Sequence, residues 1–165
     1  MQTKTVPSSA ADIQIGIEES GRFTIVKNLS RLLADEHVLY VKLRNYHWNV
    51  TGPYFQPLHA FFQEQYTEVA LQIDEIAERI RSLGHFAPGA MSGYLEQARL
   101  QESGHLDGNA QAMLKQLLAD HELIVRSLRV DLETAMELGD AGTSDFLTGL
   151  MEIHEKMAWM VRPHL

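Results

Sequence analysis

Hydrophobic residues recur at intervals of three and four along four long segments of the chain, which is the spacing of amphipathic helices. The pattern predicts helices over residues 23–49, from the Thr51-Gly52-Pro53 break to Gly84, over residues 109–138, and from Thr143 or Ser144 to just before Pro163. The last two helices are joined by a short turn, as expected for antiparallel neighbours in a bundle. We therefore expect an all-α fold.

The connection between the second and third predicted helices, residues 85–108, is long for a helical bundle and predicts structure of its own. Residues 94–98 fit a short helix inside it. Residues 1–21 show little periodicity and contain Pro7-Ser8-Ser9. We expect them to form a flexible tail in front of a single domain that spans residues 22–165.

Composition narrows the possible functions. The chain has 165 residues, 45% of them hydrophobic, which is enough for the core of one domain. It has no cysteine, so disulfides, thiolate metal sites and thiol-based peroxide chemistry are excluded. The sequence has no apolar run of membrane-spanning length, and its first 20 residues do not resemble a signal peptide. A cytoplasmic protein is the expectation.

Several polar residues on the predicted helices are interpreted as structural. Asp35 and Glu36 are expected to face solvent, and His121 and His154 are expected in core or surface positions because neither has a carboxylate three residues earlier. The one Glu-x-x-His pattern, residues 102–105, lies among loop-forming residues and is interpreted as incidental.

A stripe of possible metal ligands follows the second predicted helix. His59, Gln63, Asp74 and Glu78 are separated by steps of four, eleven and four residues. At about 100° per residue these steps nearly complete whole turns, so the four side chains share one stripe. Such charged stripes are more often simply solvated faces. A histidine and two carboxylates together also suit iron, manganese or zinc.

Distance constrains how this stripe can hold a metal. His59 and Asp74 are separated by roughly 22 Å along a helix that rises about 1.5 Å per residue, so they cannot ligate the same ion within one chain. Two copies of the helix, antiparallel about a two-fold axis, bring His59 of one copy to Asp74 and Glu78 of the other. The spacing therefore predicts metal sites between subunits.

The order of particular residues supports the metal interpretation. His47-Trp48, the Thr51-Gly52-Pro53 break, Leu58-His59 and the run from Asp74 to Arg79 follow one another. Over residues 23–159 the chain resembles the Dps family of mini-ferritins. The resemblance implies a ferritin-like four-helix bundle with a short extra helix between the second and third helices. It also implies a hollow dodecamer that oxidises ferrous iron, with hydrogen peroxide preferred over dioxygen, and stores ferric mineral.

The resemblance also implies which residues bind iron. His47 and His59 are the catalytic iron ligands of one subunit, and Asp74 and Glu78 are those of its two-fold partner. The family usually has an acid four residues after the second histidine, where this chain has Gln63. A neutral amide supplies an oxygen ligand but no negative charge. This departure weakens the expected second metal position or moves the preference towards zinc.

Three further acids have roles implied by the resemblance. Glu64 is expected to face the cavity and help to nucleate mineral. Asp140 and Asp145 flank the last helix–helix turn, where they suit helix capping. In the family, acids at this place line pores on the three-fold axes, where they concentrate cations. A further acid usual one turn later is replaced here by Gly149.

Two alternatives to a ferroxidase remain open. One is a shell that binds zinc or iron with little or no oxidation, for which Gln63 is the motivating residue. The other is a nucleoid protein that protects DNA. Direct DNA binding is not expected, because the first 21 residues contain Lys4 as their single lysine and the chain has a net charge of −8.

Overall fold

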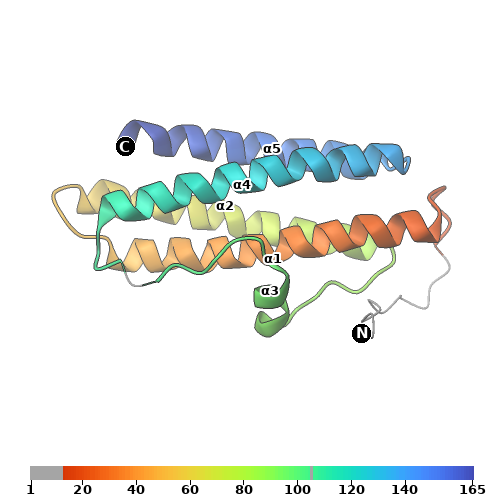
Figure 1. Cartoon of the computed structure of the whole chain (residues 1–165), viewed down its shortest axis with the longest axis horizontal. Helices are drawn as coiled ribbons and strands as arrows, with labels where there is room; N and C mark the ends of the chain where they lie inside the picture. The colour runs from red at the N-terminus through yellow and green to blue at the C-terminus, as the bar shows by residue number, and fades with distance from the viewer. Residues whose placement is uncertain (1–12, 105) are drawn as a thin grey trace.

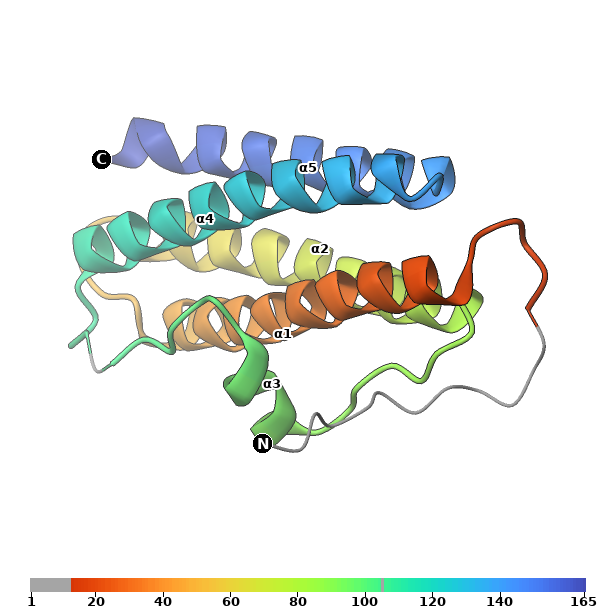
Figure 2. The same ribbon diagram turned by 45° about the vertical axis from the view of Figure 1, so that its right-hand side comes forward.

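The computed structural model describes residues 13–104 and 106–165 as two helical hairpins packed side by side (Figures 1 and 2). The first hairpin is α1 (Glu19–Asn49) with α2 (Phe55–Ser82), and the second is α4 (Ala110–Glu137) with α5 (Ala141–Val161). The short helix α3 (Met91–Gln97) lies outside the bundle against α1, and a 3-10 turn, Arg162–His164, follows α5. Neither described range contains a strand. The predicted four-helix bundle with a short extra helix is confirmed.

Helix α1 begins at Glu19, inside the predicted tail. The segment before it is tied down by Arg22, whose Nη1 donates hydrogen bonds to the carbonyl oxygens of Ile13 and Ile17 at 3.1 and 2.7 Å. The last residues of the predicted tail, from Glu19 to Gly21, therefore belong to α1. The rest of the predicted tail, residues 1–12, lies outside the described residues.

The second hairpin is defined by side-chain caps at both helix starts. The side chain of Asn109 caps α4 by accepting a hydrogen bond from the backbone N–H of Ala112. Helix α5 begins at Ala141, two residues before the earliest predicted start, because Asp140 caps it by accepting from the N–H of Thr143 at 2.9 Å. Gly139, with φ of 77°, makes the turn between the two helices.

The core is formed by the inward faces of the four long helices. Tyr46 of α1 and Phe62 of α2 are both fully buried, with ring centroids 5.7 Å apart. Burial raises the pKa of Tyr46 to about 12, and its hydroxyl donates to Oε1 of Gln116 at 2.7 Å. Tyr46 is thus a packing residue that keeps its proton, and it holds the end of α1 where His47 lies.

The expectation that Asp35 and Glu36 face solvent is wrong, because both side chains are fully buried. Asp35 accepts hydrogen bonds from the backbone N–H groups of Arg99 and Leu100 and from the Arg99 guanidinium, so it fixes the segment after α3 onto α1. Nearby, Lys42 forms a buried ion pair with Asp120 of α4. None of the helices within the described ranges is long and apolar enough to cross a membrane.

Candidate metal centre

His47 and His59 meet at the end of the first hairpin where a short loop joins α1 to α2. His47 lies in the last turn of α1 and His59 in the second turn of α2, and the two helices run antiparallel across the short connection at residues 50–54. Their rings stack with centroids 3.7 Å apart and planes inclined by 22°. The structure therefore brings together two histidines that are twelve residues apart in the sequence.

Each histidine holds the backbone of the other. Nδ1 of His47 lies 2.8 Å from the carbonyl oxygen of His59, and Nδ1 of His59 lies 2.7 Å from the carbonyl oxygen of His47. A carbonyl oxygen can only accept, so Nδ1 of each ring must be the protonated donor. In the neutral imidazoles, Nε2 of each ring then carries the lone pair. Both histidines are thus fixed in the tautomer that leaves Nε2 available to a metal.

Aromatic neighbours hold both rings in place. Tyr66 of α2 meets the His47 ring edge-on at 5.3 Å, and Phe55 lies 5.2 Å from the His59 ring. The guanidinium of Arg44 lies over the rings of Tyr66 and Trp48, at 4.8 and 5.0 Å from their centroids. His47 is 8% exposed, whereas His59 is half-buried. The histidine pair therefore lies at the edge of the buried core, close to the surface of the bundle.

The predicted acid ligands lie elsewhere on α2. Asp74 and Glu78 are both exposed, respectively fifteen and nineteen residues after His59 on the same straight helix. Within the described ranges, no group of three or more histidine or acidic side chains is placed to hold a metal ion. Within one chain, the predicted histidine ligands, on α1 and α2, therefore lie apart from the predicted acid ligands on α2.

The side chains of Gln63 and Glu64 are exposed on α2, one turn beyond His59. At the turn between α4 and α5, the exposure of Asp140 differs sharply from that of Asp145. Asp140 is 2% exposed, caps α5 and forms an ion pair with Arg79 at 2.8 Å, whereas Asp145 is exposed. The capping role expected for Asp140 is confirmed, and its carboxylate is already occupied, which leaves Asp145 as the acid open to solvent.

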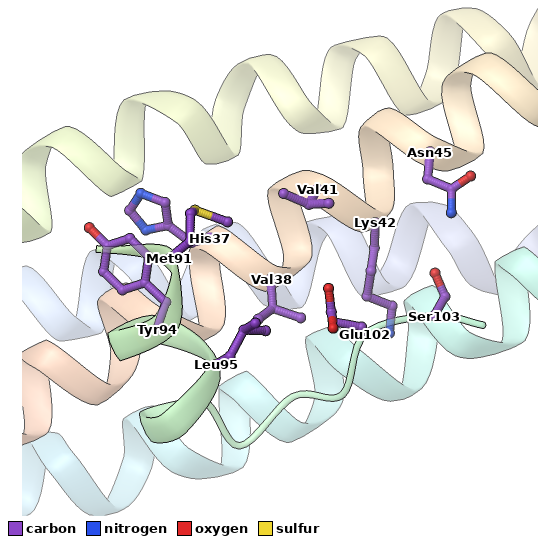
Figure 3. A pocket seen from close by; sticks show the side chains of 10 residues that line it. All are labelled: His37, Val38, Val41, Lys42, Asn45, Met91, Tyr94, Leu95, Glu102 and Ser103. Atoms are coloured by element: carbon purple, nitrogen blue, oxygen red, sulfur yellow. The ribbon is translucent and has the colours of Figure 1, made fainter. Parts of the chain in front are cut away.

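A pocket beside α3 contains none of the predicted ligands. A cavity of about 180 Å³ lies between α1 and α3 and is lined by His37, Lys42 and Tyr94 among others (Figure 3). The His37 ring stacks on Tyr94 at 3.9 Å, and its Nδ1 donates to the carbonyl oxygen of Leu33 at 2.8 Å. His37 is therefore a structural histidine.

Sequence reasoning missed a polar chain in the middle of the bundle. His121 and His154 were expected in core or surface positions, and both lie in the core. They are also hydrogen-bonded to each other, with their Nδ1 atoms 3.0 Å apart. Gln65 and Glu36 extend this chain at its two ends. The predicted incidental pattern at residues 102–105 ends on His105, outside the described residues.

Comparison with known proteins places this chain in a family. The model of the ferritin-like domain matches residues 26–165. An uncharacterized low temperature-induced protein of Nostoc is 43% identical over 151 residues, which cover 91% of this chain and 84% of the relative. DNA protection during starvation protein 2 of Bacillus anthracis is 40% identical over 141 residues, which cover 86% of this chain and 96% of the relative.

Solved structures agree with the sequence relatives. The Dps protein of Vibrio cholerae, described as a member of a broad superfamily of ferritin-like diiron-carboxylate proteins, has a TM-score of 0.88 and 34% identity, covering 95% of this chain and 98% of its own. The Dps protein of Bacillus brevis has a TM-score of 0.84 and 36% identity, covering 90% and 99%. The chain therefore belongs to the Dps family of ferritin-like proteins.

Proposed function

We propose that this chain is a subunit of an iron-storing shell that oxidises ferrous iron between pairs of subunits, with hydrogen peroxide as its preferred oxidant. The observation that carries the proposal is the reciprocal bonding of His47 and His59. It orients two imidazoles with their Nε2 atoms unprotonated, which is the state in which histidine binds a metal.

A second copy of the chain completes the site. His47 and His59 of one subunit bind ferrous iron together with Asp74 and Glu78 of the two-fold partner. Three large hydrophobic side chains beside the histidines, Trp48, Tyr54 and Phe55, are exposed in the single chain by 62%, 70% and 47%. Exposed aromatic groups at this position favour coverage by another protein surface. The partner that supplies the missing carboxylates is the natural occupant.

The proposed reaction balances without any other co-reactant. Two ferrous ions each lose one electron, and the two electrons break the O–O bond of one hydrogen peroxide molecule. With two further water molecules, the products are two units of ferric oxyhydroxide and four protons. Consuming ferrous iron and peroxide together limits formation of hydroxyl radicals. The few protein ligands leave coordination positions open to the oxidant.

The remaining acids serve transport and storage in this proposal. Asp145, exposed near the start of α5, lines the entry pores of a dodecameric shell and concentrates ferrous ions there. Glu64, exposed on α2, faces the interior and helps ferric mineral to nucleate. Asp140 supports the pore indirectly, by capping α5 and binding Arg79.

Peroxide-driven oxidation of ferrous iron under anaerobic conditions tests the proposal. The wild-type protein should oxidise ferrous iron faster than protein-free buffer, and His59→Ala should reduce the rate to that of buffer. Asp74→Asn with Glu78→Gln should do the same. Glu75→Gln is the matched control, because Glu75 is an exposed acid of the same helix outside the ligand stripe. A His59→Ala protein as active as the wild type refutes the proposed site.

A metal-binding shell without oxidation is the second candidate function. It is favoured by Gln63, which lies one turn from His59 and provides no charge for a second cation. Anaerobic titration with zinc and with ferrous iron, each followed by peroxide, separates the two functions. Metal binding without any subsequent ferric signal identifies the non-oxidising shell.

DNA protection by direct binding is a third function, and the charge of the chain opposes it. With a net charge of −8 per subunit, an assembly repels the phosphate backbone. A gel-shift assay at low salt is expected to show no retarded DNA.

A further inference from the structure

A chain of four polar side chains crosses the centre of the bundle, three of them linked by hydrogen bonds and the fourth in close contact, and each of the four long helices contributes one member. Oε1 of Gln65 from α2 lies 2.9 Å from Nε2 of His121 from α4. Nδ1 of His121 lies 3.0 Å from Nδ1 of His154 from α5. Nε2 of His154 lies 3.0 Å from Oε1 of Glu36 from α1. Gln65 is 4% exposed and the other three side chains are fully buried.

The direction of the hydrogen bonds follows from the amide oxygen at one end. Oε1 of Gln65 only accepts, so Nε2 of His121 must donate to it. In neutral His121 the other nitrogen, Nδ1, is then an acceptor, and Nδ1 of His154 must donate to it. This order leaves Nε2 of His154 facing the carboxyl group of Glu36. Without a further proton, a lone pair and a carboxylate oxygen would face each other in a dry interior.

Among residues 13–104 and 106–165, Glu36 has no other cationic partner. The four remaining buried acids of the described residues each pair with a basic side chain: Asp35 and Asp131 with Arg99, Asp120 with Lys42, and Asp140 with Arg79. The buried polar residues of α2, Gln65 and Gln72, are uncharged, and Asp120 of α4 is already paired with Lys42 of α1. His154 is therefore the one group available to balance Glu36.

The geometry does not favour a metal in place of the proton. His121, His154 and Glu36 follow one another in a line, and the described residues include no cluster of three such side chains placed around a common point. The contact between His154 and Glu36 is close but is not an aligned hydrogen bond on either side. A close contact without alignment suits the attraction of two opposite charges, which depends little on direction.

We propose that the centre of the bundle is a proton-binding site, in which His154 is a buried imidazolium paired with the carboxylate of Glu36. The extra proton makes the chain Gln65–His121–His154–Glu36 complete and electrically neutral as a whole. The four helices are thereby joined by one polar bridge whose integrity depends on pH. Burial and the neighbouring His154 lower the pKa of His121 well below its usual value, which keeps His121 the neutral acceptor that the bridge requires.

Nitrogen-15 NMR of the sedimented, metal-free, full-length protein labelled at histidine tests the protonation state directly. At pH 8 an ordinary histidine is only about 3% charged, so a signal with both ring nitrogens protonated identifies an unusual residue. This signal should be present in the wild type, disappear in His154→Gln, and change to a neutral ring in Glu36→Gln. Neutral rings for every histidine of the wild type at pH 8 overturn the proposal, as does the opposite polarity, with Gln65 donating to His121.

Thermal unfolding separates a charge role from simple packing. His154→Gln leaves Glu36 buried without a counter-charge, so its midpoint should fall by roughly 10 °C at pH 8. The fall should be smaller at pH 5, because protonation of Glu36 removes the buried charge. Adding Glu36→Gln to His154→Gln should restore most of the loss. An equal loss at both pH values, with no recovery in the double variant, shows a packing defect and contradicts the proposal.

Discussion

His47 and His59 each donate Nδ1–H to the backbone carbonyl oxygen of the other, at 2.8 and 2.7 Å. The two residues therefore determine each other's tautomer and ring orientation, and they join the last turn of α1 to the second turn of α2. This arrangement is complete within one chain, while the acids of the proposed site are not part of it. The two histidines are thus oriented within one chain, and in the proposed site the association of two subunits adds the carboxylates.

Mixing two inactive variants tests whether the two halves come from different subunits. One variant carries His47→Ala and His59→Ala, and the other carries Asp74→Asn and Glu78→Gln. When the two are co-assembled at random, half of the dimers are mixed, and each mixed dimer has one intact site of two. About a quarter of the wild-type oxidation rate should return. Sites built within one subunit would give no recovery at any mixing ratio.

Replacement of Gln63 by glutamate should strengthen the weaker metal position. The substitution adds a negative charge on the ligand stripe, one turn from His59. We expect affinity for the second ferrous ion to rise by about tenfold, since opposite charges a few ångströms apart near a protein surface attract by a few kcal/mol before solvent screening. Anaerobic titration calorimetry measures the change. Glu64→Gln, one residue away, is the control and should leave the affinity unaltered.

The helices and their order are predictable because hydrophobic periodicity is a local property of the sequence. The start of α1 cannot be predicted in this way. It depends on Arg22, which binds two carbonyl groups of a segment that has no hydrophobic periodicity. The histidine pair follows from the residue order at 47 and 59, whereas the exchange of hydrogen bonds between them appears only when two helices are placed in space. No single-helix pattern contains that information.

The buried acids show a different limit of sequence reasoning. Two adjacent charged residues, Asp35 and Glu36, have the appearance of a solvated turn of helix. Their partners are remote: Arg99 lies 64 residues beyond Asp35, and His154 comes from the last helix of the bundle. A charged side chain is stable in a protein core only when a partner balances its charge. The spacing of residues within one helix does not show where such a partner lies. The broad apolar surface of α1 was the available signal that these positions face inward.

Substitution by alanine should affect the stability of the protein strongly at Asp140 and only weakly at Asp145. Asp140→Ala removes the cap of α5 and leaves Arg79 without its acid, so the protein should lose about 3 kcal/mol of stability. Asp145→Ala changes an exposed side chain and should alter stability by less than about 0.5 kcal/mol. If Asp145 lines the entry pore, its loss should instead slow ferrous uptake several-fold. Thermal unfolding and stopped-flow iron uptake measure the two effects independently.

Acid should destabilise the bundle through His121. Burial, and secondarily the neighbouring His154, lower the pKa of His121 well below 6.5 in the folded protein, while the unfolded chain titrates near the ordinary value. As pH falls through 6.5, the unfolded state therefore binds a proton that the folded state cannot take up, and the free energy of unfolding decreases. Burial also raises the pKa of Asp120 and Asp131, which acts in the opposite direction at lower pH, because those folded acids accept protons more readily than unfolded ones.

The His121 effect can be isolated by comparing thermal midpoints of wild type and His121→Gln between pH 7 and pH 5. The wild-type midpoint should fall over this range, and the variant should lose much of that dependence, because glutamine at this position has no proton to take up. The variant is expected to be less stable than the wild type at pH 7, since its amide does not reproduce both bonds of the imidazole, to Gln65 and His154. The difference between the two proteins should therefore narrow towards pH 5. A constant difference across the range would mean that other groups cause the acid destabilisation.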